Sequence, residues 1–263
     1  MDKELAIIIL TKNNPQLLET CITSILKHTY TTEYKLYIGD TGSDPATLGI
    51  MINILKKLLD ANSCKLLQLD QYHFGKNYND MIKHHVDEEW LLMCNDDIEL
   101  QSNCIDSMLS HAKQHEHVGS VGCRLLFPNN TLQHAGQTAC VDQHGMLQCT
   151  HRGYKQTGRF QSGPVVGNTA AFMLTRKKTF HDVAGFDEMF TECWEDIHLN
   201  MKYILSGYNN WYMDDVHAIH HESVTRTKTD QALYRLRFDY TYKLKPWFDQ
   251  LSVDNQQKLL SYN

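Results

Sequence analysis

Short runs of aliphatic and β-branched residues alternate with amphipathic segments through the first hundred residues of the chain. We expect strands at residues 5–10 (LAIIIL), 35–39 (KLYIG), 64–69 (CKLLQL) and 90–94 (WLLMC), each bounded by polar turns. Strands that alternate with helices favour a mainly parallel sheet, because parallel neighbours need crossover connections. The sequence therefore predicts an α/β fold in which helices flank both faces of such a sheet.

Two of the helices are expected to begin at an Asn-Pro and an Asp-Pro pair. Asn14 and Asp44 suit the N-cap position, and Pro15 and Pro45 suit the first helical turn. The apolar positions that follow recur at helical spacing: Leu17, Leu18, Cys21, Ile22 and Ile25, then Leu48, Ile52, Leu55 and Leu59. Each segment therefore predicts a helix with one apolar face.

The second half of the chain is less regular and predicts a smaller, mixed β region. Turn residues near positions 128–130 and 144–145 favour β-hairpins, and a glycine-rich polar stretch at 151–163 favours a loop. We then expect a strand at residues 165–175, helices at 177–183 and 194–206, a strand at 211–213 and a helical segment from about residue 230.

Charge and cysteine usage exclude several classes of protein. A formal net charge of -6 offers no basic surface of the usual kind, so no nucleic-acid partner is expected. The eight cysteines form no CxxC pair and no zinc-ligand spacing, which favours reduced thiols in a cytoplasmic protein. The N-terminal stretch MDKELAIIILTK begins with an acidic residue and has a short apolar run, so neither a signal peptide nor a transmembrane segment is predicted.

Polar clusters follow three of the expected strands: TKNN at residues 11–14, DTGSD at 40–44 and NDD at 95–97. In parallel sheets ligands bind beyond the carboxyl ends of the strands, so the clusters describe one site. Adjacent carboxylates repel each other, and a shared cation relieves that repulsion. Asp96 and Asp97 therefore suit Mg²⁺ or Mn²⁺ bound together with substrate phosphates. The alternative is a solvated turn, where Asn and Asp are common.

Six blocks occur in a specific order: TKNNPQLLETCITSIL, IGDTGSDPAT, MCNDDIEL, VGNTAAFMLTR, GFDEMFTECWEDIHLNMKYILSGY and HHESVTR. In this order they resemble family 2 glycosyltransferases with the GT-A fold, in the style of bacterial rhamnosyl- and other glycan-building members. The resemblance implies a Rossmann-like sheet within a domain at residues 1–226, with a nucleotide-binding half at about 1–100 and an acceptor half at about 101–226. A C-terminal helical tail, residues 227–263, carries no motif of the family.

The resemblance assigns the nucleotide to the first two loops and to the acidic motif. Asp40 matches the aspartate that contacts the base, and a carboxylate can accept the ring N–H of uracil or thymine. Thr11, Lys12 and Asn13 are expected to line the same pocket. In the acidic motif Asp96 matches the residue that meets the ribose. The alternative for Asp40 is turn formation.

Metal binding is assigned by the same resemblance to Asp97 and a late histidine. Asn95 stands where many relatives have aspartate. The replacement lowers the negative charge of the site but leaves Asp97 as the expected metal ligand. His220 is the first choice for the histidine and His221 the second. An imidazole ligand favours Mn²⁺ over Mg²⁺. Arg226 would meet the diphosphate, with Lys228 as a further candidate; the alternative is that both are exposed charges.

Catalysis is assigned to Glu195 and Asp196, which match an acidic pair at the start of a helix. Asp196 is expected to remove the acceptor proton. The alternative is a pair of carboxylates favoured there by the helix dipole. Trp194 would contact the acceptor sugar or pack in the core, and Asn168 would lie near the donor sugar.

These assignments predict a metal-dependent inverting transferase that moves a sugar from a UDP- or dTDP-sugar to a glycan hydroxyl by single displacement. One alternative, a nucleotidyltransferase, needs a glycine-rich triphosphate loop that the sequence lacks. The other is a catalytically silent module that binds sugar nucleotides or glycans, and a pure binder needs no base such as Asp196. Peripheral association with the inner face of a membrane, further domains and oligomer formation are left open.

Overall fold

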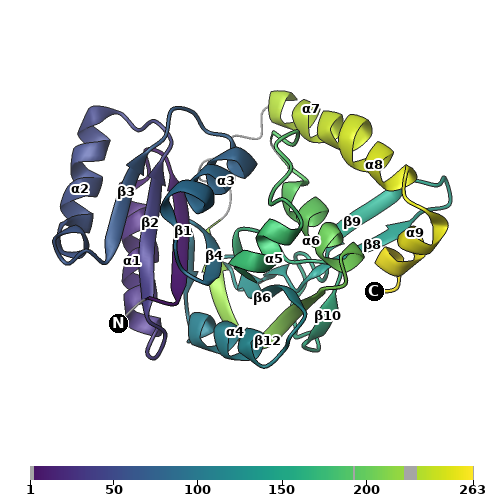
Figure 1. The fold of residues 1–263 in the computed structure, drawn as a ribbon, viewed down its shortest axis with the longest axis horizontal. Coiled ribbons are helices and arrows are strands. Elements are labelled where there is room, and N and C mark those ends of the chain that lie inside the picture. Colours follow the sequence, from purple (N-terminus) through teal and green to yellow (C-terminus); the bar gives the residue numbers. More distant parts are fainter. Residues whose placement is uncertain (1–2, 192, 222–229, 263) are drawn as a thin grey trace.

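A ten-stranded mixed sheet forms the centre of the described structure (Figure 1). The computed structural model describes residues 3–191, 193–221 and 230–262. The sheet runs in the order β10-β12-β6-β11-β4-β1-β2-β3, with β5 paired to β12 and β7 to β6. Strands β8 and β9 form a separate two-stranded sheet. The bounds are β1 (Leu5–Thr11), β2 (Tyr34–Asp40), β3 (Cys64–Gln68), β4 (Trp90–Asn95), β5 (Ile98–Leu100), β6 (Val118–Leu126), β7 (Leu132–His134), β8 (Gln137–Val141), β9 (Leu147–His151), β10 (Gly163–Val165), β11 (Phe172–Arg176) and β12 (Asn209–His220).

The first four predicted strands are confirmed, and they pair in parallel in the order β3-β2-β1-β4. The register sets Leu10 of β1 opposite Asn95 of β4, and Thr11 opposite Asp40 of β2. The carboxyl ends of the three strands therefore meet at one edge. Beyond β4 the sheet is mixed, because β11 runs antiparallel to both β4 and β6.

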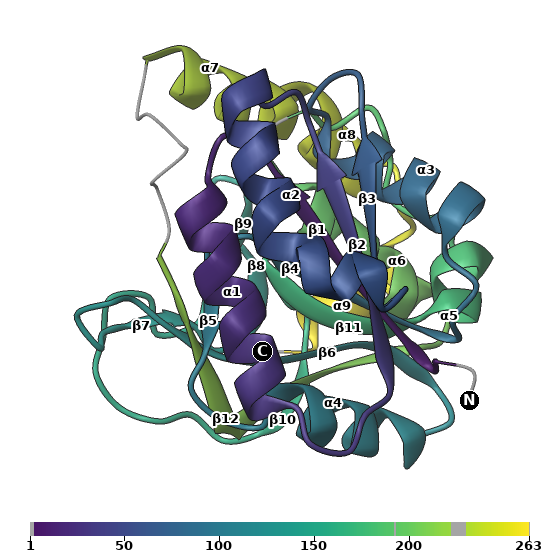
Figure 2. The ribbon, with the colours of Figure 1, turned by 90° about the vertical axis from the view of Figure 1, so that its left-hand side faces the viewer.

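Helices cover both faces of the sheet (Figures 1 and 2). Their bounds are α1 (Pro15–His28), α2 (Pro45–Asp60), α3 (Phe74–His85), α4 (Cys104–Lys113), α5 (Lys177–Asp182), α6 (Glu195–Leu205), α7 (Asp230–Asp239), the π-helical turn η1 (Tyr240–Leu244), α8 (Lys245–Asp249) and α9 (Val253–Leu260). One core cluster joins the sheet to α1, α2 and α4, and the other joins it to α3, α5 and α6. Strand β1 contributes alternate residues to the two clusters, as its period of two requires. The predicted α/β architecture is confirmed.

The two predicted N-caps differ in the structure. Asp44 Oδ1 accepts a hydrogen bond from the backbone N–H of Thr47 at 3.0 Å, as a capping aspartate should. Asn14 occupies the N-cap position of α1 but makes no capping hydrogen bond with its side chain. That side chain instead lines a cleft and hydrogen-bonds to Asp96.

The strand predicted at residues 165–175 is wrong as a single element. β10 ends at Val165 and β11 begins at Phe172, with the segment between them outside the sheet. Within that segment the Asn168 side chain is fully buried and donates to Ser120 Oγ and to the carbonyl oxygen of Trp211. The strand predicted at 211–213 is part of the longer β12. Both predicted hairpin turns are confirmed, between β6 and β7 and between β8 and β9.

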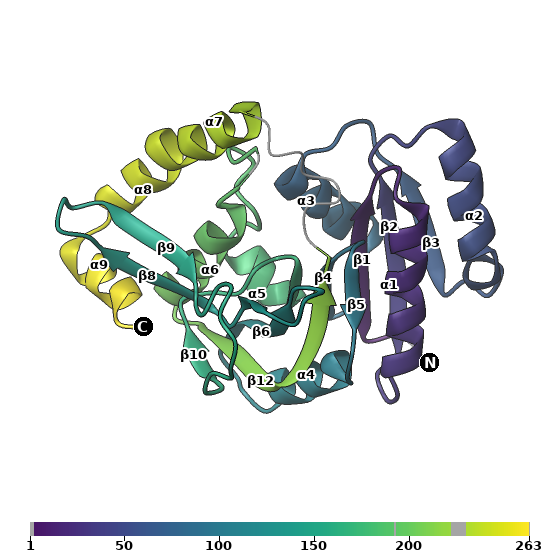
Figure 3. The same ribbon diagram turned by 180° about the vertical axis from the view of Figure 1, so that it is seen from behind.

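The C-terminal helices pack as an arm along one edge of the molecule (Figures 1 and 3). Leu244, Phe248 and Leu259 are buried in a third cluster with residues of α6, β8 and β9. No helix among the described residues is long and apolar enough to cross a membrane. The division into residues 1–226 and a tail of 227–263 stays a prediction, and the described part of the tail shares a core with the rest of the chain.

The Phe248→Ala variant is expected to lose about 3–5 kcal/mol of unfolding free energy, because the buried ring would leave a cavity in this third cluster. Urea unfolding followed by circular dichroism would measure the loss. Val253→Ala is the matched control, since Val253 is 66% exposed on α9. A loss at Phe248 no greater than at Val253 would show that the arm does not share the core.

Candidate active site

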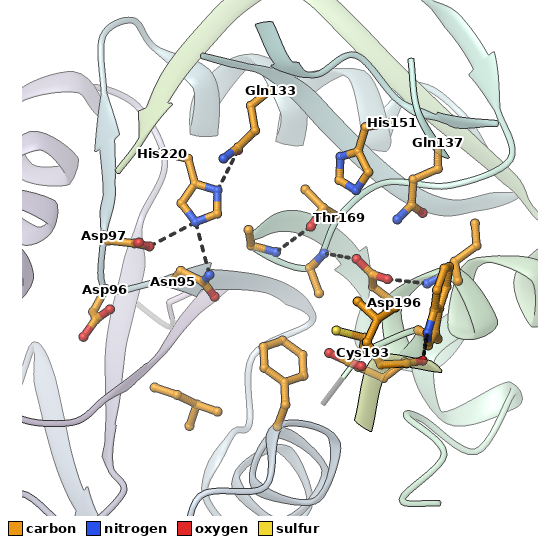
Figure 4. Close-up of a pocket in the computed structure, with 18 of the residues that line it drawn as sticks. Asn95, Asp96, Asp97, Gln133, Gln137, His151, Thr169, Cys193, Asp196 and His220 are labelled. Atoms are coloured by element: carbon orange, nitrogen blue, oxygen red, sulfur yellow. Dashed lines mark hydrogen bonds and ion pairs between the residues drawn. The ribbon is translucent and has the colours of Figure 1, made fainter. Parts of the chain in front are cut away.

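A cleft of about 600 Å³ lies at the carboxyl ends of β1, β2 and β4 (Figure 4). Asp96, Asp97 and His220 line one side of it, and Asp196 lies on the other side. The remaining lining residues come from both halves of the chain: Leu10, Thr11, Lys12, Asn14, Thr41, Tyr72, Phe74, Asn95, Gln133, Gln137, Cys149, Thr150, His151, Tyr154, Thr169, Ala170, Ala171, Cys193, Trp194, Glu195, Ile197 and Leu236. The structure thus brings the acidic motif and the acidic pair to one cavity.

Asp96 is held by the strand next to its own. Thr11 Oγ1 donates a hydrogen bond to Asp96 Oδ2 at 2.7 Å across the β1–β4 pair. Burial raises the pKa of the Asp96 carboxyl to about 6, and the charge of Asp97 adds to the rise, while the Thr11 hydrogen bond opposes it. Burial makes ionisation of the Asp96 carboxyl unfavourable. A hydrogen bond from a ligand hydroxyl, or a nearby cation, would stabilise its charged form.

Asp40 and Asn13 support the loop and do not line the cleft. Asp40 is 3% exposed and accepts hydrogen bonds from the backbone N–H and the hydroxyl of Ser43. Asn13 Oδ1 accepts from the N–H of Asp44 at 2.9 Å, and Asn13 adopts a positive φ of 55°. At the end of β2 it is Thr41 that lines the cleft. The direct contacts predicted for Asp40 and Asn13 would need this loop to rearrange.

Asp97 and His220 meet because β5 pairs with β12, which sets His220 opposite Ile98. His220 Nε2 lies 3.1 Å from Asp97 Oδ1, and both residues are buried. His220 Nδ1 donates to Gln133 Oε1 at 2.6 Å, which leaves a lone pair on Nε2 facing Asp97 (Figure 4).

His221 points away from this pair. Its Nε2 lies 2.9 Å from Glu99 Oε2, and its backbone N–H donates to the carbonyl oxygen of Asp97. His221 is absent from the cleft lining, whereas His220 is part of it. Of the two predicted histidines, His220 is the one that the fold places beside Asp97.

A divalent cation fits the Asp97–His220 pair. The described residues hold no group of three or more His, Cys, Asp or Glu side chains arranged for a metal, so the protein would supply two ligands and the substrate the rest. Asp97 Oδ1 is buried and accepts no well-aligned hydrogen bond from the described residues, although His220 Nε2 approaches it. A carboxylate oxygen and an imidazole nitrogen are both donor atoms that a divalent cation can bind.

Asp196 lies in the first turn of α6 and lines the cleft. Its Oδ1 accepts from the backbone N–H of Ile197 at 2.6 Å, and its Oδ2 accepts from that of Ala170 at 3.4 Å. These bonds orient the carboxylate at the edge of the cavity. Glu195 also lines the cleft but is 7% exposed, so Asp196 is the more accessible of the two.

Trp194 connects the cleft to the C-terminal arm, and its contact with the acceptor sugar stays a prediction. It lines the cleft, and its indole N–H donates to the carbonyl oxygen of Leu236 in α7 at 3.0 Å. Its ring centroid lies 5.5 Å from that of Tyr240. Trp194 has a left-handed φ of 77°, a conformation that costs free energy in a bulky residue. The fold therefore fixes the residue immediately before the acidic pair.

Asn168, Arg226 and Lys228 are the remaining predicted residues. Asn168 is fully buried and does not line the cleft, and its place near the donor sugar stays a prediction. Its amide instead joins Ser120 to β12. Arg226 and Lys228 lie outside the described residues.

A polar wall from β7, β8, β9 and the turn after β9 includes Gln133 and Gln137, which the sequence motifs did not predict. It consists of Gln133, Gln137, His151 and Tyr154. Gln133 lies beside His220, while Gln137 and His151 lie toward Asp196 (Figure 4). His151 Nδ1 lies 3.1 Å from Nδ1 of His134, whose pKa burial holds well below its usual range. The polar character of the hairpins was visible in the sequence, but no local signal showed which residues face the cavity.

The family pattern described as glycosyl transferase family 2 matches residues 6–184 of the chain. This chain belongs to that family. Among curated relatives of this glycosyltransferase, the O-antigen biosynthesis protein RfbC of Myxococcus xanthus is 28% identical over 238 residues, which are 85% of this chain and 18% of the relative. The N-acetylglucosaminyl-diphospho-decaprenol L-rhamnosyltransferase of Mycobacterium tuberculosis is 22% identical over 52% of this chain and 48% of its own length. The family 2 chain thus spans less than half of either relative.

Solved structures establish the fold of the glycosyltransferase. GalNAc-T7 with UDP, GalNAc and Mn²⁺ superposes with a TM-score of 0.67 at 11% identity, over 98% of this chain and 54% of that one. The mannosyltransferase PcManGT of Pyrobaculum calidifontis, in complex with GDP-Man and Mn²⁺, gives 0.66 at 14% identity, over 100% of this chain and 69% of that one. The predicted GT-A fold is confirmed.

Proposed function

We propose that this glycosyltransferase moves a sugar from a UDP- or dTDP-sugar to a hydroxyl of a glycan acceptor, with inversion at the anomeric carbon. The observation that carries the proposal is the shared cleft, with Asp97 and His220 on one side and Asp196 on the other. Two structural neighbours hold UDP with Mn²⁺ and GDP-Man with Mn²⁺, which supports a nucleotide-sugar donor.

Donor binding is assigned to the edge formed by β1, β2 and β4. Thr11, Lys12 and Thr41 line that part of the cleft, and Asp96 is available to the ribose hydroxyls. A nucleoside diphosphate brings negative charge to a chain whose formal net charge is -6. Asp97 and His220 would hold a divalent cation there, which when bound neutralises the charge that develops on the departing diphosphate.

The transfer step is a single displacement. The acceptor oxygen forms a bond to the anomeric carbon while the bond from that carbon to the diphosphate oxygen breaks, and the acceptor proton passes to Asp196. Inversion requires the nucleophile and the leaving group on opposite faces of the sugar, which suits a base across the cleft from Asp97. Asp196 can accept the proton late, when bond formation has made it acidic.

The acceptor is assigned to the polar wall of Gln133, Gln137, His151 and Tyr154. Gln137 is 5% exposed, and its Oε1 has no hydrogen-bond partner among the described residues. A buried amide in this state favours a ligand that donates hydrogen bonds, as sugar hydroxyls do. The two curated relatives are named for O-antigen and for a diphospho-decaprenol substrate, which supports a glycan acceptor on a cell-envelope lipid. Residues 1–226 would then form the catalytic domain, at the cytoplasmic side of a membrane.

A panel of sugar nucleotides tests this function directly. Hydrolysis without acceptor should be detected as release of UDP or dTDP from one donor, should need Mn²⁺ or Mg²⁺, and should stop on addition of EDTA. A panel that also contains GDP-mannose tests the base. Tight nucleotide binding without release from any donor, with or without glycan acceptors, would identify a silent binding module instead.

A further inference from the structure

Three aromatic side chains form an exposed row on the C-terminal arm. Tyr234 and Tyr242 are each 68% exposed and Phe238 is 40% exposed, and they stand four residues apart on consecutive helical turns. The ring centroids of Tyr234 and Phe238 lie 6.3 Å apart, and those of Phe238 and Tyr242 lie 4.8 Å apart. Single exposed apolar residues are normal on a protein surface, but a contiguous row marks an interaction site.

The opposite face of the same arm is fixed to the molecule. Leu236 lines the cleft and its carbonyl oxygen accepts from the indole N–H of Trp194. Tyr240 donates from its hydroxyl to the carbonyl oxygen of Leu147, and Leu244 is fully buried. The aromatic row is therefore held outward beside the cleft, on a helix with little freedom to turn it inward.

The net charge of this part of the arm is positive, whereas that of the whole chain is negative. Residues 234–245 contain Arg235, Arg237, Lys243 and Lys245 and a single acidic residue, Asp239, whereas the formal net charge of the chain is -6. Lys243 pairs with Asp239, and Lys245 pairs with Asp249. Arg235 and Arg237 are exposed beside the aromatic row.

We propose that the aromatic row and its two arginines dock this glycosyltransferase on an anionic lipid surface. Tyrosine rings favour the boundary between headgroups and acyl chains, because the ring is apolar and the hydroxyl is polar. Neighbouring arginines add attraction to anionic headgroups. The row lies on α7 and η1 along one edge of the fold (Figures 1 and 3), and none of its three residues lines the cleft, which is the kind of cavity that binds small ligands. Docking in this orientation would bring a lipid-borne acceptor to the cleft.

Vesicle sedimentation tests the aromatic part of the proposal. Wild-type protein is mixed with vesicles of phosphatidylglycerol and phosphatidylethanolamine, and the bound fraction is compared with that of a triple variant, Tyr234→Ser with Phe238→Ser and Tyr242→Ser. We expect the partition coefficient of the triple variant to be lower than that of the wild type by a factor of about ten or more. The control combines Leu26→Ser, Tyr30→Ser and Ile52→Ser, which alter exposed apolar residues on or beside α1 and α2, and it should bind like the wild type.

The double variant Arg235→Gln with Arg237→Gln tests the electrostatic part. Its affinity for the anionic vesicles should fall about fivefold for each charge removed, and its dependence on salt should weaken. Its weaker affinity for phosphatidylcholine vesicles should be unchanged. Thermal unfolding by circular dichroism confirms that each variant is folded.

Two outcomes would overturn the docking. The first is a wild-type protein that does not bind the anionic vesicles, or a folded triple variant that binds them equally well. The second is a wild-type dimer in lipid-free solution that the triple variant converts to a monomer, since the row would then be a contact between copies of the chain. Neither outcome depends on the proposed transfer reaction, because sugar-nucleotide hydrolysis in solution is measured without lipid.

Discussion

The Asp196→Asn variant is expected to transfer sugar about 100-fold more slowly than the wild type or slower still, with sugar-nucleotide affinity almost unchanged. The amide has the size of the carboxylate, and its oxygen can still accept the hydrogen bond that Asp196 Oδ1 receives from Ile197. It cannot take the acceptor proton at neutral pH. The rate is measured at saturating donor and acceptor, and the affinity by calorimetry with UDP or dTDP.

Glu195→Gln is the matched control for this variant. Glu195 lines the same cleft from the same helical turn, so its replacement tests whether any loss of charge there slows the reaction. We expect a smaller loss than at Asp196. If Glu195→Gln abolishes transfer and Asp196→Asn does not, the base has been assigned to the wrong carboxylate.

The Asp97→Ala variant is expected to lose both transfer and the cation-dependent part of nucleotide affinity. Replacing residues that only support a metal ligand already costs about 10–100-fold in affinity, so loss of the carboxylate itself should cost at least as much. Titration with UDP in Mn²⁺ and in EDTA measures the difference. Equal affinities of the wild type under the two conditions would show that the acidic motif is only a turn.

The two histidines provide an internal comparison for the cation site. His220 lies beside Asp97 Oδ1, while His221 pairs with Glu99. His220→Ala should reproduce much of the Asp97→Ala defect, and His221→Ala should remain close to the wild type in Mn²⁺-dependent affinity. The reverse order would mean that donor binding reorganises the end of β12.

Local pattern was sufficient for the nucleotide half of the fold. The runs of β1 and β4 and the Asp-Pro start of α2 are strong short-range signals, and the structure follows them. Because carboxyl ends of parallel strands meet at one edge, the positions of Thr11 and Asp96 followed from topology alone. Their hydrogen bond at 2.7 Å agrees with that reasoning.

Non-local pairing decided the parts that sequence could not predict. His220 reaches Asp97 only because β12 extends to His220 and pairs with β5, whereas a strand of three residues had been expected there. The sequence around Asn168 predicts an apolar strand. In the structure the Asn168 side chain donates hydrogen bonds to Ser120 and to β12, and the backbone at this position lies outside the sheet. Whether the side chains of Gln137 and His151 face the cavity likewise depends on how the β8–β9 hairpin packs. The alternation of side chains along a strand does not predict that packing.

The β8–β9 ribbon has its own hydrogen-bond ladder, separate from the main sheet. Its Ala139 and Leu147 face the third core cluster, while Gln137 and His151 face the cavity. Substitutions at the latter two positions need not disturb the strand pairing that joins Asp97 to His220. Under the proposed function, acceptor preference can therefore be altered by substitutions in this ribbon while the residues around Asp97 and His220 stay unchanged.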